Sequence, residues 1–199
     1  MTAQLNLFGD DVLPEPSTMP SGFRYQPDLI GAEEEAALLA WIATLHLTPY
    51  EFQGYLANRN VGAFGYRYSY QSRRMESAPA LPPLLLALRE KVAAFAGRAA
   101  EDFKQVLVTE YAPGVALGWH RDRPQYGEIV GVSLLSDCHF KLRRRAGQRW
   151  LRAAQTVAPR SAYIMAGAAR TDWEHGLPPA RARRYSLTFR TLADGFVAP

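Results

Sequence analysis

Six short segments in the second half of the chain have the pattern of β-strands, and no helical pattern separates them. Turn residues, chiefly proline and glycine, lie between these segments. The expected strands are Lys104–Tyr111, Ile129–Leu135, Cys138–Arg143, Trp150–Val157, Ser161–Met165 and Arg184–Leu192. Successive short strands of this kind are typical of sandwiches and barrels with mainly antiparallel strands. The sequence therefore predicts a mainly β domain of the α+β class.

Two helices are expected ahead of these strands. The segment Ala32–Leu45 begins with acidic residues, which suit the positive end of the helix dipole, and has an apolar stripe along one face. The second helix runs from about Pro82, a residue favoured at helix starts, to Gly97, a residue favoured after helix ends. We expect both helices to cover a sheet and to carry no chemistry.

The segment between these helices, Phe64–Tyr70, alternates strictly and predicts a single strand. One face of that strand would carry the aromatic residues, and the other would carry Arg67 and Ser69. An aromatic face most often packs into a core. Aromatic rings beside arginines can also stack on a flipped or unpaired base, so both interpretations stay open.

Length and composition limit the number of domains and the cellular compartment that we expect for this protein. A chain of 199 residues suffices for one substantial domain, and no run of apolar residues is long enough to predict a membrane span. No secretory signal pattern is visible at the start of the chain. Cys138 is the single cysteine, which excludes an internal disulfide and fits a reducing compartment. We expect a cytoplasmic, monomeric protein.

Charge is distributed unevenly along the chain. The formal net charge is +4, yet the segment from Phe140 to Arg190 holds twelve basic residues and only two acidic ones, Asp172 and Glu174. A basic half of this kind suggests an anionic partner, with nucleic acid first. The alternative is a solvated surface rich in arginine.

Residues 1–22 are rich in proline and glycine and are expected to form a flexible tail ahead of the domain at 23–199. Within the tail, Gln4–Phe8 reads Gln-Leu-Asn-Leu-Phe. This peptide resembles the motif by which bacterial replication and repair proteins dock on the sliding clamp. An apolar anchor on a disordered tail can fold into a groove of its partner. Alternatively, the tail packs back on the domain.

His120 and Asp122 are two residues apart, at a predicted strand end or loop, where both side chains can reach one metal ion. Such a pair needs a third ligand from elsewhere and open positions for substrate. Among the other histidines, only His175 lies in a segment that passes from loop to strand. The alternative is that the pair consists of ordinary polar loop residues.

The last predicted strand carries two arginines on one face. Because side chains alternate along a strand, Arg184, Ser186, Thr188 and Arg190 share one face, and Tyr185, Leu187 and Phe189 share the other. If the aromatic face packs against the helices, both guanidinium groups point into the barrel. Buried arginines are costly without anions, so they predict a ligand with carboxylates or phosphates. An edge strand with a solvated polar face is the alternative.

Four motifs occur together in the same order and spacing as in a known family. They are Tyr111-Ala112-Pro113-Gly114, the His120-x-Asp122 pair, His175 some fifty residues later, and the strand Arg184–Arg190. From about Phe23 to its end the chain resembles the AlkB family of Fe(II)- and 2-oxoglutarate-dependent dioxygenases.

The resemblance implies a double-stranded β-helix, or jelly roll, with two covering N-terminal helices. It also implies oxidative demethylation, in which 2-oxoglutarate and O₂ yield succinate and CO₂ and an N-methyl group leaves as formaldehyde. The implied metal ligands are His120, Asp122 and His175. Residues implied in cosubstrate binding are Tyr111, Thr109, Arg184, Ser186 and Arg190, with Arg184 on the distal carboxylate. Residues implied in gripping the substrate nucleotide, in a lid from Phe64 to Arg74, are Arg67, Tyr68 and Tyr70.

Three positions depart from the family's best-known member. Thr109 and Ser186 replace asparagines that contact the cosubstrate there, and both keep a hydroxyl. Pro124 replaces an acidic residue that reads the damaged base, which weakens the inference to methyladenine or methylcytosine.

We therefore expect an enzyme that demethylates alkylated bases in DNA or RNA. One alternative is the same oxygenase chemistry on a modified tRNA or a protein side chain. Another is a jelly roll that only binds nucleic acid, and a hydrolytic zinc enzyme is the least supported because it leaves Arg184 and Arg190 unexplained.

Overall fold

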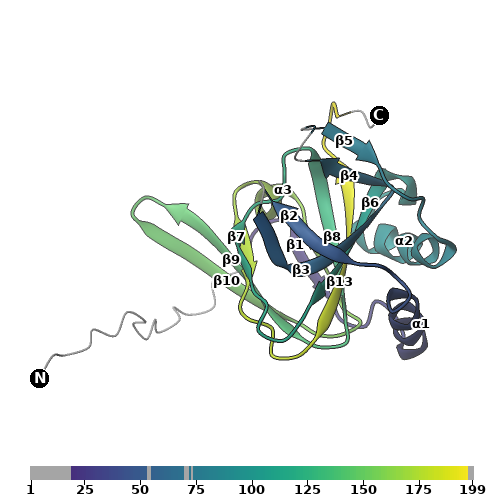
Figure 1. The fold of residues 1–199 in the computed structure, drawn as a ribbon. Helices are drawn as coiled ribbons and strands as arrows, with labels where there is room; N and C mark the ends of the chain where they lie inside the picture. Colours follow the sequence, from purple (N-terminus) through teal and green to yellow (C-terminus); the bar gives the residue numbers. More distant parts are fainter. Residues whose placement is uncertain (1–18, 53–54, 70–71, 73, 197–199) are drawn as a thin grey trace, which may run out of the picture.

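Two antiparallel sheets face each other in the computed structural model, which describes residues 19–52, 55–69, 72 and 74–196 (Figure 1). The larger sheet has the order β1 (Phe23–Gln26), β11 (Ala162–Met165), β8 (Tyr126–Leu134), β13 (Arg184–Leu192), β6 (Phe103–Tyr111), β3 (Tyr55–Phe64) and β2 (Thr48–Phe52). The smaller sheet has the order β10 (Arg149–Val157), β9 (Cys138–Ala146), β12 (Glu174–Leu177) and β7 (Leu117–His120). The mainly β fold class expected from the strand pattern is confirmed.

Helices α1 (Ala32–Ile42) and α2 (Pro83–Ala96) cover the outer face of the larger sheet (Figure 1). Their buried leucines form one apolar core with the outward residues of β8 and β13. Helix α2 ends where expected, because Gly97 adopts the left-handed conformation of a C-cap (φ 74°). Helix α1 ends at Ile42, three residues before the predicted Leu45. Two short helical segments, η1 (Ala100–Asp102) and α3 (Gly167–Thr171), complete the helices.

Strand β13 lies in the centre of the larger sheet, between β8 and β6. The alternative of an edge strand with a solvated face is therefore wrong. Leu187 and Phe189 are fully buried against the helices, as the alternation predicted. The opposite face, with Arg184 and Arg190, looks toward the smaller sheet and is at most 9% exposed. Two arginines are thus held in the interior of the sandwich.

The prediction of one strand over Phe64–Tyr70 is wrong, because Gly65 interrupts it. Strand β3 ends at Phe64, and β4 (Tyr66–Ser69) then pairs with β5 (Arg74–Ser77) in a separate hairpin. Gly65 has a φ of 76°, and a Cβ there would lie 2.1 Å from the carbonyl oxygen of Lys104. The aromatic face is consequently divided: Phe64 packs against Trp41 in the helical core, while Tyr68 lines a cleft.

A Gly65→Ala variant should lose about 2 to 4 kcal/mol of unfolding free energy, because a side chain there meets backbone and a strained φ together. Urea denaturation measures this loss. Gly147→Ala is the matched control, since Gly147 also has a positive φ (60°) but no atom within 4 Å of its Cβ position. Equal losses in the two variants would contradict a steric role for Gly65.

The chain ahead of the domain is described only from Met19. Gly22 accepts a backbone hydrogen bond from Ala166, so the described chain is already attached to the sheet just before β1. The peptide Gln4–Phe8 lies outside the described residues. Within the described part, no helix has the length and apolar character needed to cross a membrane.

Candidate metal centre

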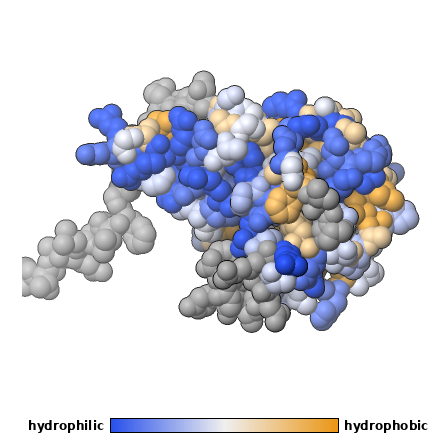
Figure 2. Space-filling model, turned by 90° about the horizontal axis from the view of Figure 1, so that it is seen from above, coloured by the Kyte–Doolittle hydropathy of each residue, from blue (hydrophilic) through white to orange (hydrophobic). Residues whose placement is uncertain are grey.

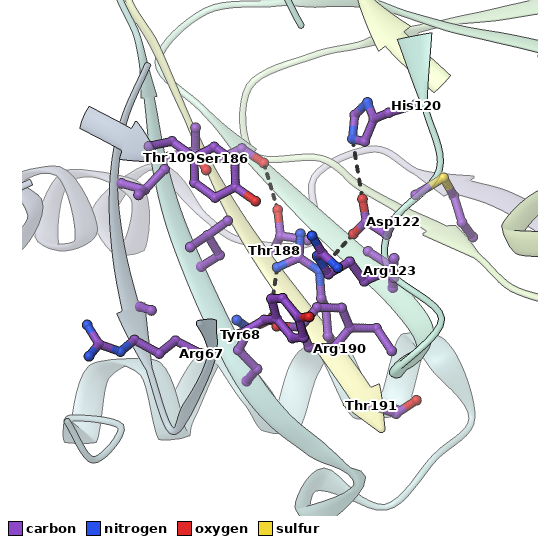
Figure 3. A pocket seen from close by; sticks show the side chains of 18 of the residues that line it. Arg67, Tyr68, Thr109, His120, Asp122, Arg123, Ser186, Thr188, Arg190 and Thr191 are labelled. Carbon is purple, nitrogen blue, oxygen red and sulfur yellow. Dashed lines mark hydrogen bonds and ion pairs between the residues drawn. The ribbon is translucent and has the colours of Figure 1, made fainter. Parts of the chain in front are cut away.

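His120 and His175 are brought together by the pairing of β7 with β12. They are register partners in this antiparallel pair, and their ring centroids are 4.2 Å apart. Asp122 follows β7 by two residues, and its carboxylate points toward His120 (Figure 3). Ligand atoms of all three residues lie within 4.8 Å of one another. Two neighbouring strands and one loop thus create the set of side chains that the sequence suggested.

The carboxylate of Asp122 lies at the centre of this cluster. Its Oδ1 is 3.4 Å from Nε2 of His120 and 3.7 Å from Nε2 of His175. Nδ1 of His120 lies 2.8 Å from the carbonyl oxygen of Gly118, so a proton on Nδ1 would leave Nε2 free as a ligand. Two imidazoles and one carboxylate with open positions form the donor set of a facial triad, which suits Fe(II).

The protonation states favour metal binding. Burial opposes ionisation of Asp122, but Arg190 and the two histidines hold the pKa of its carboxyl well below the usual range. Burial lowers the pKa of His175 to about 3, and neighbouring His120 acts in the same direction. Near neutral pH the site therefore offers an ionised carboxylate and a neutral His175 imidazole, the forms that a metal ion requires.

Arg190 positions the carboxylate of Asp122 through an ion pair. Its Nε donates to Oδ2 of Asp122 at 2.8 Å (Figure 3). Its Nη1 donates to Oε1 of Gln105 at 3.0 Å. The side chains of Arg190 and Asp122 are both about nine-tenths buried. This ion pair orients the carboxylate so that Oδ1 remains directed at the histidines. Gln105 was not identified from the sequence, because nothing local marks it as a partner of β13.

Arg184 is a buried cation that lacks a carboxylate partner among the described residues. It is 2% exposed; its Nη2 donates to Ser133 Oγ at 3.0 Å, and its guanidinium lies 5.0 Å from the Tyr111 ring centroid. Its Nε is buried and has no hydrogen-bond partner in the described chain. Thr109 and Ser186 place buried hydroxyls on adjacent strands. An anion with several oxygens, such as 2-oxoglutarate, fits these unsatisfied donors.

A cleft of about 2330 Å³ extends from the triad to the β4–β5 hairpin. Sites for small molecules usually measure about 300–1,000 Å³, so this cleft has room for more than a small cosubstrate. At its rim the Arg123 guanidinium lies 4.0 Å from the Tyr68 ring centroid, and Arg67 is paired with Glu76 at 3.1 Å. Tyr70, the third residue expected to grip the substrate, lies outside the described residues.

Arg170 fixes the loop that follows Asp122, a role that the sequence did not reveal. It is largely buried, and its guanidinium donates to the carbonyl oxygens of Arg123, Tyr126 and Gly127 at 2.6 to 2.9 Å. The loop carrying Asp122 is therefore anchored by Arg170 of α3.

His139 does not belong to the metal centre. It is exposed on the opposite face of the smaller sheet from His175, with its Nδ1 3.2 Å from Thr156 Oγ1.

Residues 41–190 match the family model of the 2OG-Fe(II) oxygenase superfamily. The chain belongs to this superfamily. Members use Fe(II), 2-oxoglutarate and O₂, and the matched segment contains the triad and both buried arginines. The chain is thus an oxygenase, and the donor set and the unpaired Arg184 fit the superfamily's metal and cosubstrate.

Relatives with curated descriptions carry AlkB-type names. An Arabidopsis thaliana protein described as "Alkylated DNA repair protein ALKBH8 homolog" is 28% identical over 84% of this chain and 57% of its own length. The mouse protein "tRNA (carboxymethyluridine(34)-5-O)-methyltransferase ALKBH8" is 28% identical over 82% of this chain and 25% of its own length. The chain thus spans between a quarter and three-fifths of these relatives.

Among solved structures, OsALKBH1 superposes with a TM-score of 0.63 and 16% sequence identity. The match covers 89% of this chain and all of that one. At this identity the likeness concerns the fold, and it confirms the jelly roll expected from the AlkB resemblance. Together with the superfamily match and the names of the relatives, it confirms the resemblance itself.

Proposed function

We propose that this AlkB-type oxygenase oxidises a modified base in DNA or RNA, removing an N-alkyl group as an aldehyde. The observation that carries the proposal is the cleft above the triad, which is larger than the cosubstrate needs and has arginine and tyrosine side chains at its rim. A planar base can stack on Tyr68, while cationic side chains suit the adjoining phosphates. The names of the relatives also support a nucleic-acid substrate.

Each residue of the centre then has a distinct task. His120, Asp122 and His175 would hold Fe(II), which with 2-oxoglutarate and O₂ supplies the oxidising chemistry of the superfamily. Arg184 would take the distal carboxylate of 2-oxoglutarate, and the hydroxyls of Thr109, Ser186 and Tyr111 lie around the same space. Arg190 would keep Asp122 oriented beside the metal-bound end. The buried side chains at the bottom of the cleft would exclude water from the reacting atoms.

A second candidate substrate is a modified uridine in tRNA. The names of the mouse and Xenopus tropicalis relatives mention carboxymethyluridine at position 34 of tRNA. Pro124 follows Asp122 by two residues and offers neither a side-chain donor nor an acceptor to a base. A base recognised mainly by stacking and shape is compatible with this position.

A panel of substrates decides between these candidates. Methylated single- and double-stranded DNA, methylated RNA and tRNA bearing modified uridines would be incubated with Fe(II) and 2-oxoglutarate. Formaldehyde release with a net loss of CH₂ from the base supports demethylation, whereas gain of one oxygen without formaldehyde supports tRNA hydroxylation. Absence of turnover on every nucleic acid, in a protein that binds both cofactors, would refute the nucleic-acid substrate.

We also propose that the tail peptide Gln4–Phe8 binds a sliding clamp, as its sequence motif suggests. Deleting these residues should abolish binding to a bacterial clamp and leave turnover of free oligonucleotides unchanged, because the peptide precedes the catalytic domain. Surface plasmon resonance measures the first effect and succinate formation the second. Undiminished clamp binding by the truncated protein would rule out the peptide.

A further inference from the structure

The smaller sheet has an inner and an outer face of opposite character. On β9, Phe140 and Leu142 are buried, and Phe140 stacks with His175 at 5.3 Å. Because side chains alternate along a strand, the residues between and after them point outward. Lys141 and Arg145 are exposed there, and Arg143 is half-buried. The metal centre thus lies on one side of this sheet and a row of cations on the other.

Neighbouring strands extend this outer surface. Trp150 and Arg152 on β10 are register partners of Arg145 and Arg143, and Trp119 on β7 precedes the metal ligand His120. We call these outward residues the tryptophan–arginine face: Trp119, Lys141, Arg143, Arg145, Trp150 and Arg152. Hydrophilic residues predominate on the projecting part of the molecule where β9 and β10 lie (Figures 1 and 2).

Arg143 fixes the two indole rings in place. Its guanidinium lies 4.5 Å from the Trp119 ring centroid and 4.3 Å from that of Trp150, and its Nε donates to Glu174 at 2.7 Å. Gly176 allows β12 to pass close to the backbone of β7, because a Cβ there would lie 2.9 Å from the carbonyl oxygen of Leu117. The tryptophans therefore form an ordered surface, and Trp119 remains 39% exposed.

The remaining charge on the face is positive. Glu174 neutralises Arg143, whereas Lys141 and Arg145 form no ion pair within the described part of the chain. Alternate residues on a strand are about 7 Å apart, so the row from Lys141 to Arg145 spans about 14 Å. Cations in a row beside aromatic rings are the combination that binds unpaired nucleic acid.

We propose that the tryptophan–arginine face binds the single-stranded segment adjoining the nucleotide in the cleft. Lys141, Arg145 and Arg152 contact its phosphates, and Trp119 and Trp150 stack on its bases. Trp119 connects this face to the metal centre through the next residue, His120. The inference rests on the proposed nucleic-acid substrate and adds the path that the strand follows outside the cleft.

A double variant, Lys141→Gln/Arg145→Gln, tests the phosphate contacts. Its matched control is Arg24→Gln/Lys91→Gln, which removes the same charge on the helix-covered side of the molecule, where Arg24 bonds to the carbonyl of Phe95 in α2. Both are compared with the unaltered protein on a methylated trinucleotide and a methylated dodecanucleotide. KM for the longer strand should rise about tenfold in the test variant alone, with kcat and the trinucleotide KM unchanged.

Salt dependence and stacking provide independent measurements. By fluorescence anisotropy, the slope of log affinity against log salt should fall by about 1.4 in the test variant, the value for two lost phosphate contacts on a single strand. Trp150→Leu should weaken single-strand binding at least about fivefold without changing that slope.

The outcomes separate this inference from the proposed function. If the unaltered protein demethylates both oligonucleotides and the test variant behaves like its control, the tryptophan–arginine face does not bind the strand. A second result would also exclude the tryptophan–arginine face as the binding surface for the single strand. That result is an equal loss of affinity for duplex and for single-stranded nucleic acid in the Trp150→Leu variant. If the unaltered protein accepts neither oligonucleotide, the proposed function fails first.

Discussion

An Asp122→Ala variant should lose all measurable turnover of 2-oxoglutarate. The carboxylate is the one anionic ligand of the triad, and without it two imidazoles remain to hold a divalent ion. Anaerobic titration with Fe(II) and 2-oxoglutarate, followed by the metal-to-ligand charge-transfer absorption, should show no band. Succinate formation measures the accompanying loss of activity.

The same substitution leaves Arg190 buried without its carboxylate, which costs about 3–5 kcal/mol of stability. Asp122→Asn keeps the shape of the side chain and therefore separates loss of the ligand from loss of the fold. As a control for removing a paired carboxylate, Glu128→Gln breaks a partly exposed ion pair with Arg98 outside the triad and should keep full turnover. Turnover by a folded Asp122→Ala protein would refute the triad.

An Arg184→Gln variant should raise KM for 2-oxoglutarate by about 10- to 150-fold, the effect of losing one charged hydrogen-bonding group of about 1.5–3 kcal/mol. Fe(II) binding should persist, because Arg184 bonds to Ser133 and not to the triad. The variant should also fold, since removing Arg184 leaves no carboxylate unpaired. Initial rates at varied 2-oxoglutarate measure the change.

The neighbouring Arg183 offers a matched control, because its side chain is 59% exposed and pairs with Glu110 outside the cosubstrate space. Arg183→Gln should leave KM for 2-oxoglutarate unchanged. An unchanged KM in Arg184→Gln would instead place the cosubstrate carboxylate elsewhere. Arg190→Gln is less informative, because it would leave Asp122 without its ion-pair partner.

Alternation along β13 predicted both of its faces correctly, because a central strand must bury one apolar side and the pattern of Leu187 and Phe189 is regular. The same rule was wrong at Phe64–Tyr70. A glycine at a positive φ bends the chain there without disturbing the alternation of apolar and polar residues in the sequence. Local pattern therefore predicts a strand's faces but does not reveal where a backbone bend divides it.

The sequence alone could not predict which distant strands would pair, and therefore which residues would contact the arginines of β13. Gln105 reaches Arg190 because β6 lies beside β13, and Ser133 reaches Arg184 because β8 lies on its other side. Arg170 reaches the loop after Asp122 from a short helix with no catalytic signature. These residues are ordinary in composition, and only the register of the sheets makes them partners of the centre.

The centre is divided between the two layers of the sandwich. The residues that would bind the metal come from the smaller sheet and the loop after it, while the residues that would receive 2-oxoglutarate lie on the larger sheet. The Asp122–Arg190 ion pair joins the two. A metal ion chelated by 2-oxoglutarate would therefore act as a second cross-link between the layers. The melting temperature should therefore rise more with the metal ion and 2-oxoglutarate together than by the sum of the increases that each produces alone. The reason is that each ligand, once bound, makes the residues that bind the other more rigid.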